Sequence, residues 1–250
     1  MSLFDESGMR KTARAVFYEN FEILNPLTPS LDDQQVYVID GGYLLHRVIW
    51  QNNKTLKEII QIYVQYVKKH YGNALVIFDG YPDDLTNSLK TVERLRRQKK
   101  SVGREINFDL NTRLTVPQEK FLSNSKNKQR LINLLSRALV ESDCSTALAD
   151  EDADVLLVFS SIDLAKTEKH VVLVGQGIDL LVLLTQKTPA ELTVYFLKRG
   201  KTFQSDCWYS NKSLCYNLLQ KHIAFLHVVT GCDTVSCMHK QGRKQVIKSF

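Results

Sequence analysis

The sequence predicts an α/β protein whose central sheet is mostly parallel and flanked by helices. Three short apolar runs, Val36–Ile39, Ala74–Phe78 and Val171–Val174, have the length and composition of strands buried on both faces. Segments with helical spacing separate them, and strands that alternate with helices build a parallel sheet. We expect one domain over residues 35–250, preceded by an N-terminal extension of residues 1–34.

The predicted elements begin with a short helix over residues 13–21, which precedes the first strand at Val36–Ile39. Tyr43–Trp50 is typical of a buried helix. Apolar residues from Leu56 to Val67 recur at 3.6-residue spacing, which predicts an amphipathic helix before the second strand at Ala74–Phe78.

The second half of the chain continues the alternation. Acidic residues at 150–154 open a helix that runs to Phe159, because negative charge is favourable in a first helical turn. The remaining predictions are a helix over 118–141, strands at 145–148, 171–174 and 192–197, an apolar segment at 180–184, and helices over 212–220 and 222–229.

The composition fits a globular protein, with 44% hydrophobic and 24% charged residues. No apolar run approaches the ~20 residues of a membrane span, and the first residues lack the pattern of a signal peptide. The five cysteines are scattered and odd in number, which does not indicate a disulfide framework. We therefore expect an intracellular protein, in the nucleus or the cytoplasm, with no membrane partner.

The basic charge of the chain gathers in one segment. Residues 86–104 are compatible with an exposed helix, because their apolar face is thin. From Lys90 to Arg104 the surplus of cations over the single acid Glu93 equals the +6 of the whole chain. Such a local surplus suits phosphate groups, and Arg96–Lys100 suits a nuclear import signal equally well. The cations are Lys90, Arg94, Arg96, Arg97, Lys99, Lys100 and Arg104.

Several well-known catalytic and binding motifs are excluded, because the sequence lacks a residue that each of them requires. A dinucleotide-binding turn would need a glycine where Leu180 stands, and a two-aspartate phosphatase would need an aspartate where Gly42 stands. Four possible zinc ligands recur every five residues, a step that does not share a helical face, so we interpret them as core histidines and buried thiols. They are His222, His227, Cys232 and Cys237.

Carboxylates mark the ends of predicted elements at five places. Each alone is more often a turn former or helix cap. If they converge, two carboxylates ~4 Å apart repel by about 4 kcal/mol at an effective dielectric of 20, so a cation or a proton is needed. Oxygen ligands suit Mg²⁺ or Mn²⁺, which can support phosphodiester hydrolysis. The five places are Asp40, Asp79, residues 150–154, Asp179 and Asp233.

Five motifs in this order and spacing resemble the flap-endonuclease-like 5′-nuclease superfamily, a branch of the PIN-like group. The similarity covers residues 35–250, and the phrase that begins at His227 is similar to an uncharacterised animal PIN-like lineage. The motifs are Val-Ile-Asp40-Gly-Gly, Ile-Phe-Asp79-Gly-Tyr-Pro, Glu151-Asp152-Ala-Asp154, Gly-Ile-Asp179-Leu-Leu and Thr-Gly231-Cys-Asp233-Thr.

The resemblance implies a PIN-like fold and a site for up to two Mg²⁺ or Mn²⁺ ions. It implies that residues 86–104 form an arch-like helix that grips substrate, and that residues 222–250 begin a helical duplex-binding element. The implied metal ligands are Asp40, Asp79, Asp152, Asp154, Asp179 and Asp233, and Glu151 is added because it shares a helical face with Asp154.

The cations are assigned roles on the same basis. Lys90, Arg94 and Arg97 are expected to orient the scissile phosphate and to stabilise transition-state charge. The remaining cations are expected to contact nucleic acid, either DNA or RNA. They are Arg96, Lys99, Lys100, Arg104, Lys240, Arg243 and Lys244.

Gly177 departs from the pattern of the superfamily. It stands two residues before Asp179, where members of the superfamily carry a second acid. The leading hypothesis is therefore a metal-dependent nuclease with one ligand fewer than expected. The alternative is a catalytically degenerate module that binds nucleic acid or a protein partner without cleavage.

Overall fold

The computed structural model describes ten stretches of the chain, and the side chains of residues 4–5, 8–9, 14 and 15 are not among them. The chain forms two compact units, one of residues 36–157 and one of residues 1–35 with 158–250. The described stretches are 4–5, 8–9, 14–25, 35–51, 53–80, 103–150, 152–200, 204–215, 220–232 and 235.

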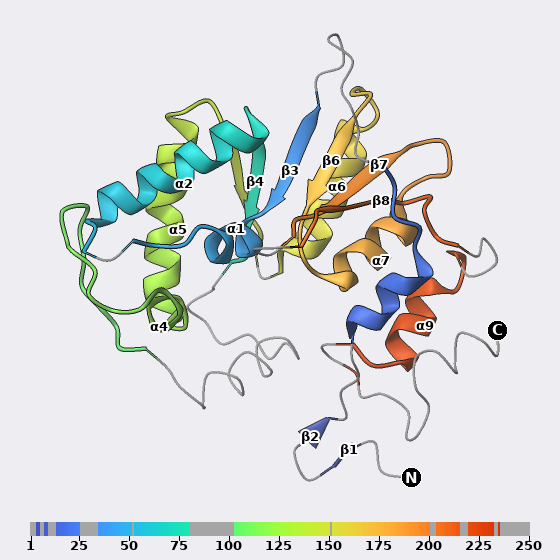
Figure 1. Cartoon of the computed structure of the whole chain (residues 1–250), viewed down its shortest axis with the longest axis horizontal. Helices are drawn as coiled ribbons and strands as arrows, with labels where there is room; N and C mark the ends of the chain where they lie inside the picture. The colour runs from blue at the N-terminus through green and yellow to red at the C-terminus, as the bar shows by residue number, and fades with distance from the viewer. Residues whose placement is uncertain are drawn as a thin grey trace. The chain divides into compact units, whose positions relative to one another are not determined.

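Six strands form the central sheet, in the order β5-β4-β3-β6-β7-β8. The pairs β3–β4, β4–β5 and β6–β7 are parallel, whereas β7–β8 is antiparallel. Helices flank the strands (Figure 1). The predicted fold class, a mostly parallel sheet flanked by helices, is confirmed. The prediction of a single domain after an N-terminal extension stays a prediction.

The 36–157 unit is continuous in sequence. Its helix α2 starts with a capping box, in which Thr55 and Glu58 bond each other's backbone amides, and ends at Gly72 with φ 64°. Figure 1 shows α2 beside α5. The elements are β3 (Val36–Asp40), α1 (Gly41–Arg47), α2 (Leu56–Tyr71), β4 (Leu75–Phe78), α4 (Gln118–Leu122), α5 (Ser125–Val140), β5 (Ser145–Leu148) and the start of α6 (Ala153–Leu164).

The helix predicted over 118–141 is two helices. Asn124 has extended backbone angles, φ −89° and ψ 120°, and its side chain accepts a hydrogen bond from Asn127 N. An asparagine in this geometry caps a new helix rather than continuing the old one, because its side chain competes for backbone amides. The chain therefore turns between α4 and α5.

The other unit combines both ends of the described chain. Two short strands, β1 (Phe4–Asp5) and β2 (Gly8–Met9), pair with each other near the N-terminus. The remaining elements are a 3₁₀ helix, η1 (Arg14–Asn20), β6 (Val171–Val174), α7 (Ile178–Lys187), β7 (Val194–Lys198), β8 (Cys207–Ser210) and α9 (Ile223–Val229).

Residues 14–25 belong to the core of that second unit. Phe17 and Phe21 are 2% and 4% exposed. The backbone of Leu24 bonds to Trp208, and Phe21 forms a bridge with Leu214. These contacts anchor the N-terminal residues across β8. The strand β8 itself, four residues long and at the edge of the sheet, was not predicted from the sequence. Residues 212–215, predicted as the start of a helix over 212–220, instead form the end of a turn and this bridge.

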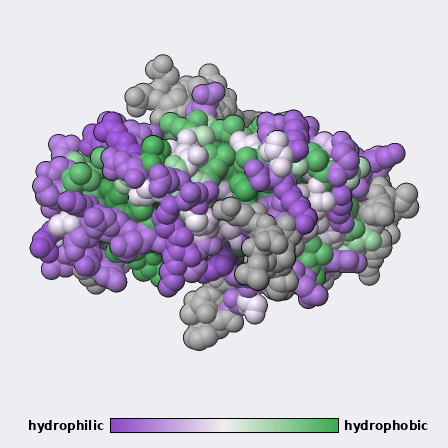
Figure 2. Space-filling model, turned by 90° about the horizontal axis from the view of Figure 1, so that it is seen from above, coloured by the Kyte–Doolittle hydropathy of each residue, from purple (hydrophilic) through white to green (hydrophobic). Residues whose placement is uncertain are grey.

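Polar residues dominate the face seen in Figure 2, with apolar patches between them. Among the exposed large apolar side chains are Ile49 and Ile23, at 81% and 64%. Within the part of the chain that the structure describes, no helix combines the length and apolar character needed to cross a membrane.

Two glycines let the ends of β3, β4 and β5 approach closely. A Cβ on Gly41 would lie 2.2 Å from the Phe78 ring, and one on Gly80 would lie 2.1 Å from the carbonyl oxygen of Ala149. Neither distance is possible for real atoms. Because glycine has no side chain, the residues after β3, β4 and β5 can lie this close together.

We predict that Gly80→Ala destabilises the protein by about 3 kcal/mol or more, because the obstructing atoms belong to the backbone and cannot rotate away. Chemical denaturation measures the change. Gly177→Ala is the matched control, since its Cβ would meet only Leu180 N at 4.0 Å, and the exchange of a glycine N-cap for a poorer one should cost no more than about 1 kcal/mol. Equal effects of the two substitutions would contradict the close approach.

Candidate functional site

Asp40 ends β3 and caps α1. Its Oδ1 accepts hydrogen bonds from Gly42 N at 2.8 Å and Tyr43 N at 3.2 Å. Burial raises the pKa of the Asp40 carboxyl to about 6, the Tyr43 amide opposes this, and the nearby charge of Asp79 raises it further. Asp40 is therefore both a helix cap and a carboxylate whose negative charge is poorly compensated.

Asp79 ends the neighbouring parallel strand β4 and reaches the start of α6. Its Oδ1 accepts a hydrogen bond from Ala153 N at 3.0 Å. Asp152 and Asp154, both partly buried, flank Ala153 in the chain. The structure thus brings three of the predicted places together within the 36–157 unit: Asp40 lies near Asp79, and Asp79 holds the first turn of α6.

Lys128 is a functional candidate that sequence reasoning missed. It lies in the first turn of α5. Burial raises the pKa of the Asp40 carboxyl, and the charge of Lys128 is the smallest of the influences that oppose this rise. Burial lowers the pKa of His46, and the charge of Lys128 adds to that effect. A cation within electrostatic reach of the carboxylates can attract a phosphate to them. Its sequence position gave no sign of this, because α5 starts almost fifty residues after Asp79.

Asp179 has a different environment, in the other unit. It is the second residue of α7, and its Oδ1 lies 2.6 Å from Nε2 of His227 on α9. Because a carboxylate oxygen accepts, Nε2 carries the proton of this bond. The His227 side chain is 7% exposed, and Phe17 packs edge-on against its ring.

His227 therefore does more than fill the core. Its second nitrogen, Nδ1, is buried and has no hydrogen-bond partner among the described residues. The expectation of a buried histidine holds for this residue, but the paired carboxylate was not foreseen. For His222 the expectation was wrong, because that residue is exposed as the N-cap of α9.

Gly177 precedes α7 as its N-cap and provides no side-chain hydrogen bond there. Its φ of −80° and ψ of 132° are open to any residue, and a Cβ would meet only Leu180 N at 4.0 Å. The backbone therefore does not require glycine here. The missing acid is a property of the sequence and not of the local geometry.

Most of the predicted cations cannot be placed. Arg104 is described and exposed. Within the described ranges, no cluster of three or more His, Cys, Asp or Glu residues is arranged to hold a metal ion. The predicted residues that lie outside the described residues are Lys90, Arg94, Arg96, Arg97, Lys99, Lys100, Glu151, Asp233, Lys240, Arg243 and Lys244.

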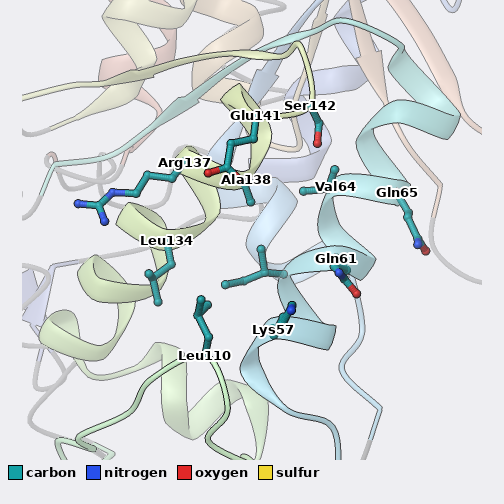
Figure 3. A pocket seen from close by; sticks show the side chains of 11 residues that line it. Lys57, Gln61, Val64, Gln65, Leu110, Leu134, Arg137, Ala138, Glu141 and Ser142 are labelled. Atoms are coloured by element: carbon teal, nitrogen blue, oxygen red, sulfur yellow. The ribbon is translucent and has the colours of Figure 1, made fainter.

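A hollow of about 570 Å³ between α2 and α5 is separate from these residues. Figure 3 shows Lys57, Gln61 and Gln65 from α2 opposite Leu134 and Arg137 from α5. None of the carboxylates predicted as ligands lines it. The carboxylates at the strand ends, and not this hollow, are therefore the candidate site.

No family model matches the sequence, and no curated protein matches it. Solved structures do match. The catalytic core of Rad2 in complex with DNA substrate superposes with a TM-score of 0.51 and 15% identity, over 87% of this chain and 62% of that one. The chain has the flap-endonuclease-like, PIN-like fold. A T5 protein co-crystallised with metal ions has a TM-score of 0.51 and 16% identity, over 86% of this chain and 74% of that one.

The flap-endonuclease-like fold confirms what the five sequence motifs predicted at the level of architecture. This chain spans 62% of the length of the Rad2 catalytic core. At 15% and 16% identity the likeness concerns the fold. The metal ligands and the phosphate-contacting cations stay predictions.

We predict that Asp40→Asn stabilises the metal-free protein at pH 8 by roughly 1–2 kcal/mol. The folded-state pKa of about 6 lies above the ordinary 3.8. As pH rises between these two values the unfolded state ionises first, so the protein loses stability, and the loss reaches its full size above about pH 6. Asparagine keeps the oxygen that accepts from Gly42 and Tyr43. The expected gain is smaller than the free energy that a shift of about two pKa units represents, because solvent reaches the partly buried Asp40 and screens its charge.

The gain should vanish at pH 4, where the wild-type carboxyl is protonated, and denaturation at both pH values measures it. Asp109→Asn is the matched control. The hydrogen bond from the Thr112 hydroxyl lowers the pKa of the exposed Asp109 carboxyl. Removing the charge of Asp109 should therefore give no gain in stability at pH 8. A gain from Asp40→Asn that is the same at both pH values would contradict the raised pKa.

Proposed function

We propose that this chain is a divalent-metal-dependent nuclease that hydrolyses phosphodiester bonds of DNA or RNA. One observation carries the proposal. Asp79, at the end of β4, bonds the first turn of α6 between Asp152 and Asp154 and lies near Asp40 at the end of β3. The carboxyl ends of parallel strands are where α/β folds bind ligands.

The chemistry of the four donors suits Mg²⁺ or Mn²⁺, although the described residues are not arranged as a cluster that would hold the ion. All four side chains offer hard oxygen ligands, and the raised pKa of Asp40 reflects negative charge that a cation would balance. When bound, such an ion activates water and stabilises the leaving oxygen in phosphodiester hydrolysis. The T5 protein co-crystallised with metal ions and the Rad2 core in complex with DNA share the fold, which supports this chemistry.

The side chains of this chain would act by position and charge. Backbone amides fix one oxygen of Asp40 and one of Asp79, so both carboxylates are oriented before any ligand arrives. Lys128 adds a cation within electrostatic reach of Asp40, which would draw the substrate phosphate toward the site. Lys90, Arg94 and Arg97 are proposed to orient the scissile phosphate.

A second candidate function is supported by the other unit. Gly177 offers no ligand, and Asp179 is held by His227. A site weakened in this way would bind nucleic acid, or a protein partner, without cutting. This catalytically degenerate module differs from the nuclease in one measurable property, which is turnover.

The decisive experiment incubates the purified protein with labelled single-stranded, duplex and flap DNA and RNA, in Mn²⁺ or in EDTA. We expect cutting in Mn²⁺ only. Asp40→Asn with Asp79→Asn should lower it roughly a hundredfold or more, since removing groups that only support metal ligands already costs 10–100-fold. Asparagine keeps both backbone hydrogen bonds, so folding is preserved.

Two outcomes would decide against the nuclease. Cutting that survives the double substitution would remove these residues from the site. The absence of cutting by the wild type, with salt-sensitive nucleic-acid binding retained, would favour the degenerate module. Asp163→Asn is the matched control, because Asp163 is an exposed acid near the C-terminal end of α6, paired only with Lys166 in the described structure.

We predict that Gly177→Asp is tolerated and raises stability by a few tenths to about 1 kcal/mol. Aspartate is a favoured N-cap, and replacing glycine reduces the entropy of the unfolded chain. If the missing acid limits turnover, cutting in Mn²⁺ rises as well. Gly177→Asn separates the two effects, because it caps α7 without adding the charge. Equal rates for both variants would show that the missing charge does not limit turnover.

A further inference from the structure

A second hollow of the 36–157 unit, of about 670 Å³, lies along residues 103–120. Three cationic side chains line it: Arg104 and Arg113 from the segment before α4, and Lys120 from α4 itself. All three residues are exposed. Among its apolar lining residues Val116 is partly exposed, whereas Leu114 is 8% exposed and presents little surface.

One wall is fixed to the corner between α4 and α5. Asn127, which is 0% exposed, accepts a hydrogen bond from Ile106 N and donates one to the carbonyl oxygen of Arg104, both at 2.9 Å. Gly103 N donates to Ser123 Oγ at 2.9 Å. A Cβ on Gly103 would lie 1.9 Å from the Lys120 carbonyl oxygen, so the two strips of backbone touch.

The other wall is fixed to the start of α2. Leu56 N donates to the Thr112 carbonyl at 2.9 Å, and Arg113 Nη1 donates to the Asn53 carbonyl at 2.9 Å. With both walls held by the backbone, the hollow is formed before any ligand binds. Preformed sites spend little binding energy on ordering.

The charge of the hollow is positive because Glu105, the only acid among its described lining residues, is already paired. Glu105 bonds Lys126 at 3.1 Å and Arg130 at 2.8 Å, and the hydrogen bond from Lys126 is the main cause of its lowered pKa. Arg104 and Lys120 make no side-chain hydrogen bond or ion pair with the described residues. Two cations are therefore available to an anionic ligand.

We propose that this hollow binds the sugar-phosphate backbone of one strand of nucleic acid. Arg104 and Lys120 would contact phosphates, and the apolar surface of Val116 would lie against the sugars. The volume is that of an ordinary small-ligand pocket, which takes a short piece of one strand but not a duplex. No aromatic ring of the described residues lines the hollow, so base stacking and sequence preference are not expected.

The sequence favours a polyanion over a single small anion. Arg104 is both a wall of the hollow and the last cation of the segment from Lys90, the most basic part of the chain. The inference takes its ligand class from the proposed function, but it does not depend on the carboxylate site or on cutting.

The test measures binding of a labelled single-stranded oligonucleotide in EDTA, as a function of salt. Each phosphate contact contributes about 0.7 to the slope of log affinity against log salt. Arg104→Gln with Lys120→Gln should reduce the slope by about 1.4 and weaken binding at low salt. Arg113 is left in place because it also holds the wall to Asn53.

Lys69→Gln with Arg137→Gln is the matched control. It removes the same charge from exposed residues in the last turns of α2 and α5, neither of which lines this hollow. We expect its slope to stay within a few tenths of the wild type. Equal slopes for the two double variants would overturn the proposal. Tighter binding of polyglutamate than of the oligonucleotide would overturn the nucleic-acid assignment.

The same variants separate this inference from the nuclease proposal. If the double variant has a smaller salt slope and the wild type does not cut in Mn²⁺, nucleic-acid binding in the hollow is supported and the nuclease proposal is contradicted. Unchanged slope in a protein that cuts contradicts the hollow and leaves the nuclease in place. If the double variant at Arg104 and Lys120 unfolds at the same temperature as the wild type, any loss of binding is not caused by a loss of fold.

Discussion

The hydrogen bond from Ala153 N to Asp79 Oδ1 is the contact on which the candidate site depends. It joins the end of β4 to the start of α6, across 74 residues of sequence. Glycines at 41 and 80 allow that approach, because any larger residue would overlap neighbouring atoms. The same bond satisfies an orphan amide at a helix start and sets the direction of a carboxylate. Structural and ligand-binding roles are therefore combined in one side chain.

This combination changes the usual choice between a capping aspartate and a functional one. Asp40 caps α1 through two amides, yet its carboxyl is harder to ionise than an ordinary cap because burial and Asp79 both oppose the charge. A cap needs only an acceptor, and a neutral asparagine would provide it without that cost. A charge kept where a neutral residue would suffice is typical of sites where function opposes stability.

The sequence was sufficient for features that depend on local pattern. Apolar runs such as Val171–Val174 predicted strands, and Asp40 and Asp79 were recognised as carboxylates at the ends of two such strands, where α/β folds place ligands. It was insufficient where contacts are distant or local signals conflict. Asn124 breaks a run of helix formers, and the pairing of Asp179 with His227 spans 48 residues with no periodic pattern behind it. Lys128 is one cation among several on α5, and only the fold distinguishes it.

The packing of Phe17 and Phe21 has a consequence for how the protein is made. Their partners, including Leu214 and His227, are synthesised roughly two hundred residues later. At ~5–20 residues per second the N-terminal aromatics wait roughly 10–40 s for them, whereas the continuous 36–157 unit is complete well before. During synthesis Phe17 and Phe21 are thus buried only after the whole 36–157 unit has been made. An expression boundary at residue 35 would leave the surface they cover permanently open to water.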